Sequence, residues 1–384
     1  MDFLTSGESH GKELTVIISK TPSGIKFDMD YINSELSRRQ AGYGRGKRMQ
    51  LETDKIEVVS GVRFGKTTGS PITLKIINKD WENWKEKMSS SPQKNIAKIR
   101  IPRPGHTDYA GLIKYFEDDI RNLLERSSAR ETAARVALGA FCKSVLKYFD
   151  IEILSHTVSI GKISIKKRYG ADDIKSVYND SCLRCVDKEA EKKMVKYIDL
   201  IKKSGDSIGG IFEVIILNLI PGIGSHIQHN TKLDAKIASA IISIQGIKGV
   251  EFGEGFNGSI LKGSEYHDQF GLKKKRIIRL SNNCGGVEGG ISNGQPIVFK
   301  AVMKPIPTLL NPLQSVDLDD LKIKKTFVER SDVCVVPAAG VVAESNTANV
   351  ILDALFDEFG YDNILLIKKR YFDKFKMIRE KYGF

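Results

Sequence analysis

The sequence has no long apolar run, no internal repeat and few cysteines among its 384 residues. No stretch approaches the roughly 20 apolar residues of a membrane-spanning helix, so we expect no membrane partner. The N-terminal stretch has neither a basic start nor an apolar core, and we expect no export signal. The five cysteines are scattered and odd in number, which indicates a reduced, cytoplasmic protein rather than a disulfide scaffold.

Aromatic residues are scarce where positive charge is dense. The net charge of +13 suits an anionic partner, such as a nucleic acid, an acidic lipid or a phosphorylated small molecule. Many lysines are equally explained as solvated faces. Single-stranded nucleic acid binds to stacking aromatic rings, and the most basic stretch, 38–49, offers only Tyr43. We therefore expect no nucleic-acid partner, and an RNA-binding protein is the alternative from a different class.

The spacing of apolar residues predicts groups of strands and long, alanine-rich helices. The clearest helix is 128–149, where Ser128 and Glu131 have the spacing of a capping box. A second helix covers 348–359 and ends at Gly360. Strands are expected at 13–19, 55–62, 71–78, 151–165 and 211–220, and 231–252 is expected as helix, turn and strand.

This order of elements favours a layered α+β fold over a regular βαβ repeat. Neither a low-complexity linker nor a repeat divides the chain, so we expect one large domain over 1–384. Residues 166–205 are charged and irregular, and we expect them to form a peripheral excursion from that domain.

Two histidines stand in glycine-flanked turns. His10 lies in TSGESHG, and His106 follows Pro104-Gly105 and precedes Asp108 in RPGHTDYAG. An imidazole titrates near neutral pH and can give or take a proton, and glycine lets a ligand approach the backbone. The alternatives are a capped turn with a surface histidine at the first stretch and a turn histidine satisfied by Asp108 at the second.

Two basic stretches predict anion binding. In 38–49, the residues Arg39, Arg45 and Arg48 stand among glycines, and arginine binds phosphate or carboxylate through two parallel hydrogen bonds. In RSSARE, which begins at Arg126, two serines stand at a predicted helix N-terminus, where backbone N–H groups favour a phosphate. Simple capping is the alternative at the second stretch.

Two later runs complete the set of candidate sites. The glycine-rich run 282–308 leads into a strand and then KPIPT, and it suits a planar ring, a phosphate or a set of hairpin turns. In 329–337, Arg330 and Asp332 stand just before an apolar run that we expect to be a strand. An arginine beside an aspartate keeps the carboxylate fit to accept a proton, and a plain surface ion pair is the alternative.

Three other sequence motifs lack the neighbouring residues that their usual function needs. GEGFNG, 253–258, has the glycine spacing of a dinucleotide-binding loop but opens no convincing helix. Cys182 and Cys185 form a lone C-x-x-C, and His226 and His229 a lone H-x-x-H. Neither pair has the second pair that a zinc site needs, so we expect no metal.

The six candidate stretches together resemble the chorismate synthase family. GESHG, RPGHTDY, RSSARETAARVA, GDSIGG, IKGVEFGEGF, GGVEGGISNGQPI and RSDVCVVPAAGVVAE stand in the order and approximate spacing of that family, over residues 6–360. The resemblance implies a carbon–oxygen lyase that converts 5-enolpyruvylshikimate 3-phosphate into chorismate and phosphate by an anti-1,4-elimination. This is the last step of the shikimate pathway to aromatic amino acids, and it needs reduced FMN without net redox change.

The resemblance also implies residue roles. His10 would protonate the departing phosphate, His106 would protonate or hold the reduced flavin, and Asp332 would assist the flavin N5 nitrogen in removing the ring proton. Anions of the substrate and cofactor would meet Arg39, Arg45 and Arg48. Cofactor contacts are implied for Arg126, Ser127, Ser128, Gln245, Gly246, Gly289, Lys304, Pro305, Ile306, Pro307, Thr308 and Arg330.

Two positions depart from the family pattern. Family members often have Asn-Ala where this chain has Gln245-Gly246, and ESNTAN, 344–349, is more polar than we expect in the last helix. The resemblance further implies a β-α-β sandwich, with helices between two antiparallel sheets, and a homotetramer. Some family members reduce their own flavin, so NADPH is a possible reductant, and a flavin reductase is the alternative enzyme.

Overall fold

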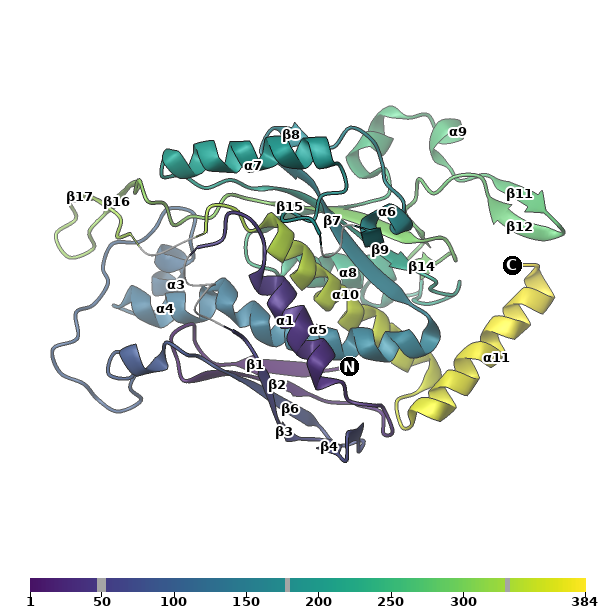
Figure 1. The fold of residues 1–384 in the computed structure, drawn as a ribbon, viewed down its shortest axis with the longest axis horizontal. Helices are drawn as coiled ribbons and strands as arrows, with labels where there is room; N and C mark the ends of the chain where they lie inside the picture. The colour runs from purple at the N-terminus through teal and green to yellow at the C-terminus, as the bar shows by residue number, and fades with distance from the viewer. Residues whose placement is uncertain (47–52, 177–179, 329–331) are drawn as a thin grey trace.

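The computed structural model describes residues 1–46, 53–176, 180–328 and 332–384. Two of the predicted site residues, Arg48 and Arg330, lie outside these described residues. The described chain is one domain of mixed helix and strand (Figure 1), which agrees with the predicted α+β class.

The first sheet is antiparallel and has the strand order β1-β2-β6-β3. Its central strands alternate in exposure, so that Leu14, Val16 and Ile18 of β2 point to the core, as do alternate residues of β6. The predicted strands at 13–19, 55–62 and 71–78 are confirmed. The strands are β1 (Phe3–Ser6), β2 (Glu13–Ile18), β3 (Ile56–Ser60) and β6 (Ile72–Ile77).

The second sheet has five antiparallel strands in the order β10-β15-β9-β7-β8. The predicted strand at 151–165 is a hairpin, because Gly161 takes a φ of +52° and turns the chain back on itself. The strand at 211–220 and the helix, turn and strand at 231–252 are confirmed. The strands are β7 (Glu152–Ile160), β8 (Ile163–Ser164), β9 (Gly210–Leu217), β10 (Ile247–Phe252) and β15 (Ile297–Met303).

Helix α5 (Thr132–Leu146) contacts β2 and β6 of the first sheet, and α10 (Val336–Phe359) contacts β7 and β9 of the second. The two helices pack on each other, and α1 (Met29–Gln40) packs on both (Figure 1). Gly139 permits this close approach, since a Cβ there would lie 2.2 Å from Cβ of Ser345. The helices thereby fix how the two sheets and their loops face each other.

Further helices and hairpins surround these elements. The helices are α3 (Asp108–Tyr115), α4 (Ile120–Ser127), α6 (Ala171–Ser176), α7 (Lys188–Lys203), α8 (Leu233–Ile242), α9 (Gly263–Tyr266) and α11 (Ile364–Tyr382). The hairpins pair β4 (Val62–Arg63) with β5 (Lys66–Thr67), β11 (Phe270–Lys273) with β12 (Arg276–Arg279), β13 (Val287–Glu288) with β14 (Ile291–Ser292) and β16 (Gln314–Val316) with β17 (Ile323–Lys325).

The capping box predicted at the start of the long helix is wrong. The Ser128 hydroxyl accepts a hydrogen bond from the Arg130 N–H, and a short 3₁₀ turn precedes α5. The Glu131 carboxylate accepts instead from Thr5 and Arg135. The Glu131 carboxylate is therefore bound by other side chains, and it does not cap the helix.

The last long helix begins much earlier than predicted. We expected an apolar strand after Asp332 and a helix from 348, but α10 is continuous from Val336 to Phe359. Nearly all of its side chains are buried, and a fully apolar run does not distinguish a buried helix from a strand. The predicted end at Gly360 is confirmed.

The polar run 344–349 lies in the middle of α10, and its charges are paired. Glu344 is fully buried and accepts hydrogen bonds from Lys143, Arg184 and Ser155 at 2.7–2.9 Å. Buried charges of this kind need both ion pairs and hydrogen bonds. Glu344, the one charged residue of this run, therefore belongs to an internal ion-pair cluster.

The prediction of irregular structure over 166–205 is wrong for its second half. Helix α7 covers Lys188–Lys203, and Ala190, Met194 and Ile198 on one face are buried in the main core. Their spacing of four residues was the available signal, but the surrounding lysines and glutamates obscured it.

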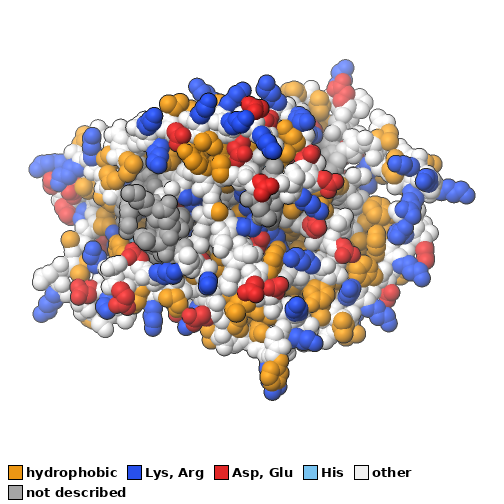
Figure 2. All heavy atoms as spheres, viewed as in Figure 1, with side chains coloured by type: hydrophobic (Ala, Val, Ile, Leu, Met, Phe, Trp, Pro, Cys, Tyr) orange, Lys and Arg blue, Asp and Glu red, His pale blue; other side chains and the backbone are white. Residues whose placement is uncertain are grey.

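Basic side chains are spread over the surface. Figure 2 shows Lys and Arg mixed with Asp and Glu over most of one face, with blue side chains gathered at the end where α11 and the β11–β12 hairpin lie in Figure 1. Across the described ranges, no helix is both long and apolar enough to span a bilayer.

Candidate active site

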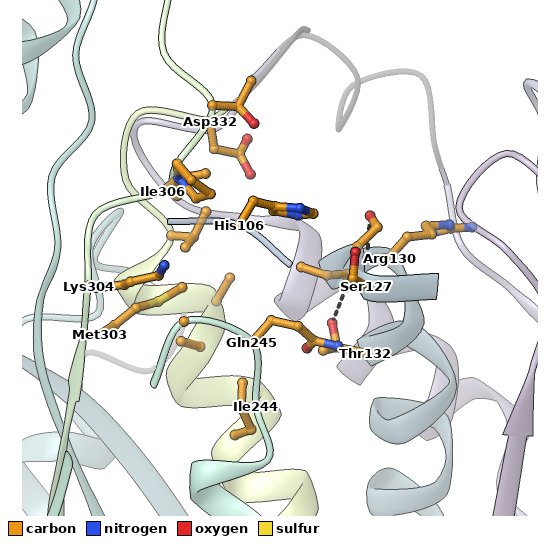
Figure 3. A pocket seen from close by; sticks show the side chains of 18 of the residues that line it. His106, Ser127, Arg130, Thr132, Ile244, Gln245, Met303, Lys304, Ile306 and Asp332 are labelled. Carbon is orange, nitrogen blue, oxygen red and sulfur yellow. Dashed lines mark hydrogen bonds between the residues drawn. The ribbon is translucent and has the colours of Figure 1, made fainter. Parts of the chain in front are cut away.

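Loops from both sheets and the ends of the helices α1, α4, α5 and α10 line a cavity of about 490 Å³. Figure 3 shows Ser127 and Arg130 on one side of it, Lys304 and Ile306 on the other, and Gln245 below them. The cavity is lined by thirteen of the predicted site residues: His10, Arg39, Arg45, His106, Ser127, Ser128, Gln245, Gly246, Lys304, Pro305, Ile306, Pro307 and Thr308. Asp332 lines it as well, so all three predicted catalytic residues meet in one place.

His10 stands in the turn between β1 and β2 and is held by Glu125 of α4. Its ring Nδ1 lies 2.9 Å from Glu125 Oε1, and its backbone N–H donates to Glu125 Oε2 at 2.8 Å. The ring stacks on Trp84 with 3.9 Å between centroids. Burial raises the pKa of Glu125, but hydrogen bonds from His10 and Arg121 outweigh it and lower that pKa.

His106 stands in the turn before α3 and is held by Asp108. Gly105 allows this turn with a φ of +75°, and His106 Nδ1 contacts Asp108 Oδ1 at 2.5 Å. Arg103 donates to the same carboxylate from its Nε at 2.8 Å. Burial raises the pKa of Asp108, but the hydrogen bonds from His106 and Arg103 outweigh it and hold that pKa well below its usual range. The histidine is thus satisfied by the aspartate and still lines the cavity.

Asp332 enters the cavity just before α10. Its Oδ2 lies 3.0 Å from Arg45 Nη1, and its Oδ1 accepts from the Gly46 N–H at 2.5 Å. Figure 3 shows its carboxylate above His106. The stretch that carries Arg45 and the stretch that carries Asp332 are therefore joined at the cavity wall.

Arg39 is one of the buried cations that line the cavity. Its Nε donates to the Thr132 hydroxyl at 2.9 Å, and its Nη2 donates to the Ala129 carbonyl at 2.9 Å. Burial lowers the pKa of Arg39 to about 10, although the charge of Asp54 opposes this effect. The guanidinium stays protonated at neutral pH and supplies positive charge next to the predicted serines.

Gln245 and Gly246 occupy the turn between α8 and β10. Gln245 Nε2 donates to Glu131 Oε2 at 3.3 Å, and among the described residues its Oε1 is buried and has no hydrogen-bond partner. Because a carboxylate only accepts, Glu131 fixes which end of the amide it meets. Gly246 has a φ of +86°, a region that favours glycine.

The run Lys304–Thr308 forms the opposite wall. Lys304 Nζ donates to the Gly105 carbonyl, and Arg103 Nη1 donates to the Thr308 hydroxyl at 3.2 Å. Burial and, to a smaller degree, the charge of Lys248 lower the pKa of Lys304. The His106 turn and this wall therefore support each other.

Two predicted cofactor residues do not line the cavity. Arg126 donates to the carbonyls of Thr5 and Gly7 at 2.7 and 3.2 Å. Gly289 lies in the turn between β13 and β14, next to His226. Neither residue therefore belongs to the cavity lining, and their cofactor contacts stay a prediction.

Sequence reasoning missed several residues of the site. Arg103 and Arg130 line the cavity and stood inside stretches that we had selected, so their signal was present. Lys248 also lines it, and it stood in IKGVEFGEGF, one of the stretches that carry the family resemblance. Glu125 and Trp84 hold His10 from elements far along the chain, and no local pattern indicates that contact. In the described part of the chain, no three His, Cys, Asp or Glu residues are grouped as metal ligands.

Comparisons with known proteins agree with this geometry. A family model described as chorismate synthase matches residues 1–356. The chain is 51% identical to chorismate synthase of Aquifex aeolicus, over 97% of this chain and 96% of that protein. It is 48% identical to chorismate synthase of Caldicellulosiruptor bescii, over 99% of this chain and 100% of that protein.

A solved crystal structure of a chorismate synthase has the same fold. It is 41% identical in sequence with a TM-score of 0.79, and the match covers 100% of this chain and 98% of that chain. The chain therefore belongs to the chorismate synthase family.

Proposed function

We propose that this chain binds 5-enolpyruvylshikimate 3-phosphate in the cavity and eliminates phosphate from it to give chorismate. The observation that carries the proposal is the convergence of two histidines, one aspartate and several cations on one cavity of about 490 Å³. The substrate carries a phosphate and two carboxylates, so it needs a cationic cavity. The elimination removes a proton from the substrate ring and delivers one to the departing phosphate, and imidazole and carboxylate groups can accept and donate protons.

The residues of the cavity fit reduced FMN as cofactor. The buried Gln245 Oε1 is an acceptor without a partner among the described residues, and the isoalloxazine ring carries N–H donors. Apolar wall residues such as Ile244 and Val342 suit the flat ring, and the Ser127 and Ser128 hydroxyls and Lys304 suit its polar groups. When bound, reduced FMN supplies transient electron density to the breaking C–O bond. The residues that would hold it are Ser127, Ser128, Gln245, Gly246 and Lys304–Thr308.

The chain's own groups would bind the substrate anions and move protons. Arg39 and Arg45 line the cavity, and with Arg48 they are the proposed partners of the substrate's phosphate and carboxylates. His10 would donate a proton from its ring to the departing phosphate. The Asp332 carboxylate would hold the proton that leaves the substrate ring, and His106, fixed by Asp108, would hold a proton next to the cofactor.

Further features of the family are proposed for this chain. These are a β-α-β sandwich with helices between the two sheets, a homotetramer and a cytoplasmic location. The described cysteines are all free, which supports a reduced environment. NADPH is proposed as a possible reductant of the cofactor, and aerobic turnover with NADPH and FMN but without an added reductase would test it.

An anaerobic assay tests the proposed reaction. The purified chain with reduced FMN should release one phosphate for each chorismate formed, and oxidised FMN alone should not support turnover. Equal phosphate release with oxidised FMN, or none with reduced FMN, would contradict the proposal.

A further inference from the structure

Glu125 contacts the His10 turn at more points than a simple ion pair requires. Its side chain accepts from both the ring Nδ1 and the backbone N–H of His10, at 2.9 and 2.8 Å. Its backbone carbonyl accepts from the Ser9 N–H at 3.0 Å. Three contacts from one residue of α4 therefore fix both the position of the turn and the edge of the ring.

Trp84 and Arg121 complete the enclosure of this imidazole. Trp84 covers one face of the ring, with 3.9 Å between centroids and 28° between planes. Arg121 Nη1 donates to Glu125 Oε1 at 3.0 Å, and its guanidinium lies 5.0 Å from the centre of the Trp84 ring. An aromatic face favours a cation above it, so Trp84 stabilises the Arg121 cation and packs against one face of the His10 ring.

We infer that Glu125 is a positioning residue that keeps a proton on Nδ1 of His10, so that Nε2 is the nitrogen that donates to the leaving phosphate. A carboxylate has no proton to donate, so the ring nitrogen that faces it must carry one. Before transfer, both ring nitrogens of His10 are protonated. After transfer, the proton from Nε2 is on phosphate, and a neutral ring with Nδ1–H is left.

This inference rests on the proposed role of His10 as proton donor, and Glu125→Gln separates the two. Glutamine has one acceptor oxygen where glutamate has two. The backbone N–H of His10 is a permanent donor, so the glutamine oxygen should pair with it and leave the NH₂ group facing Nδ1. Two donors then oppose each other if Nδ1 is protonated. The variant should therefore favour the tautomer with its proton on Nε2 and disfavour the doubly protonated ring.

Kinetics and ¹⁵N NMR of labelled histidine test the inference together. Glu125→Gln should lower kcat by at least about 10-fold, as when the carboxylate partner of a functional histidine is changed, while KM changes little. The ¹⁵N shifts of His10, assigned with His10→Ala, should change from the Nδ1–H to the Nε2–H form. Glu125→Asp keeps the charge and should recover part of kcat and the original tautomer.

Glu117→Gln is the matched control, because Glu117 is exposed and hydrogen-bonds Asn122 instead of a histidine. It should leave both readouts unchanged. Wild-type kcat in Glu125→Gln together with loss of activity in His10→Ala would overturn the inference, as would an unchanged His10 tautomer. Wild-type turnover in His10→Ala would instead remove His10 from the proposed proton transfers and leave the proposed reaction standing, and the nitrogen shifts would still decide whether Glu125 sets the tautomer.

Discussion

The two histidines of the cavity are held by carboxylates of different origin. Asp108 follows His106 by two residues, within one glycine-containing turn. Glu125 is 115 residues away from His10 and reaches it only because α4 docks on the β1–β2 turn. The first pair is specified by local sequence, and the second is a product of the tertiary fold.

The two carboxylates also differ in their other partners. Asp108 is fully buried and accepts from the backbone N–H, Nε and Nη2 of Arg103 at 2.8–3.0 Å. Glu125 gives most of its contacts to His10 and one to Arg121. The comparison suggests that Asp108 stabilises the fold as well as the histidine, whereas Glu125 acts chiefly on the histidine.

Removal of either imidazole should have the largest effect. His10→Ala and His106→Ala should each lower kcat for phosphate release by about 10²–10⁴-fold, the range for a positioned acid or base. The assay is anaerobic phosphate release with reduced FMN. A wild-type rate in one variant would remove that histidine from the mechanism and end the comparison.

Asp332 extends the comparison to a carboxylate that is bound by Arg45 and by the Gly46 N–H. Asp332→Ala should lower kcat by a similar factor, because it removes the proposed proton acceptor. Flavin binding, measured by difference absorbance, should be largely retained. Loss of binding with an unchanged rate at saturating flavin would assign Asp332 to cofactor binding instead.

Asp108→Ala should lower the stability of the fold, which tests the structural role assigned to Asp108. It leaves the buried Arg103 without its carboxylate, and loss of one partner of a buried pair costs about 3–5 kcal/mol. The free energy of unfolding should fall by this amount at pH 7 in a urea titration. Asp118→Ala is the control, because Asp118 forms an exposed pair with Lys98, and it should leave stability nearly unchanged.

The difference in unfolding free energy between wild type and Asp108→Ala should depend on pH, because the pKa of Asp108 is low in the folded chain. Because its folded pKa lies below its unfolded value of about 3.9, the stabilisation is fully present above pH 4. It is lost as the pH falls through the folded pKa. The stability gap between wild type and Asp108→Ala should therefore shrink on acidification below about pH 4, and a gap that grows there would contradict the assigned pairing.

Strands of the first sheet could be predicted from the sequence, because β2 and β6 alternate between buried and less buried residues. Leu14, Val16 and Ile18 are an example, and each is almost fully buried. The start of α10 could not be predicted, since its run from Val336 is apolar on every face. Helix α7 was missed because charged residues surround the three that it buries.

The site was predictable where motifs carry its residues. His10, His106 and Asp332 stood in glycine-rich or charged turns, and the fold brings them to one cavity. Glu125 and Trp84 carry no local signal, because their role depends on which elements pack together. Arg126 was selected for its place near a helix start, but its guanidinium is bonded to the carbonyls of Thr5 and Gly7.

The most direct test of the shared cavity is a ligand titration of ¹⁵N-histidine-labelled chain, with His10 and His106 assigned by their alanine variants. Oxidised FMN and substrate added together should form a complex without turnover, and the imidazole signals of both histidines should shift with the same midpoint. A shift at only one of them, or at neither while the ligands are bound, would contradict the claim that two distant turns form one site.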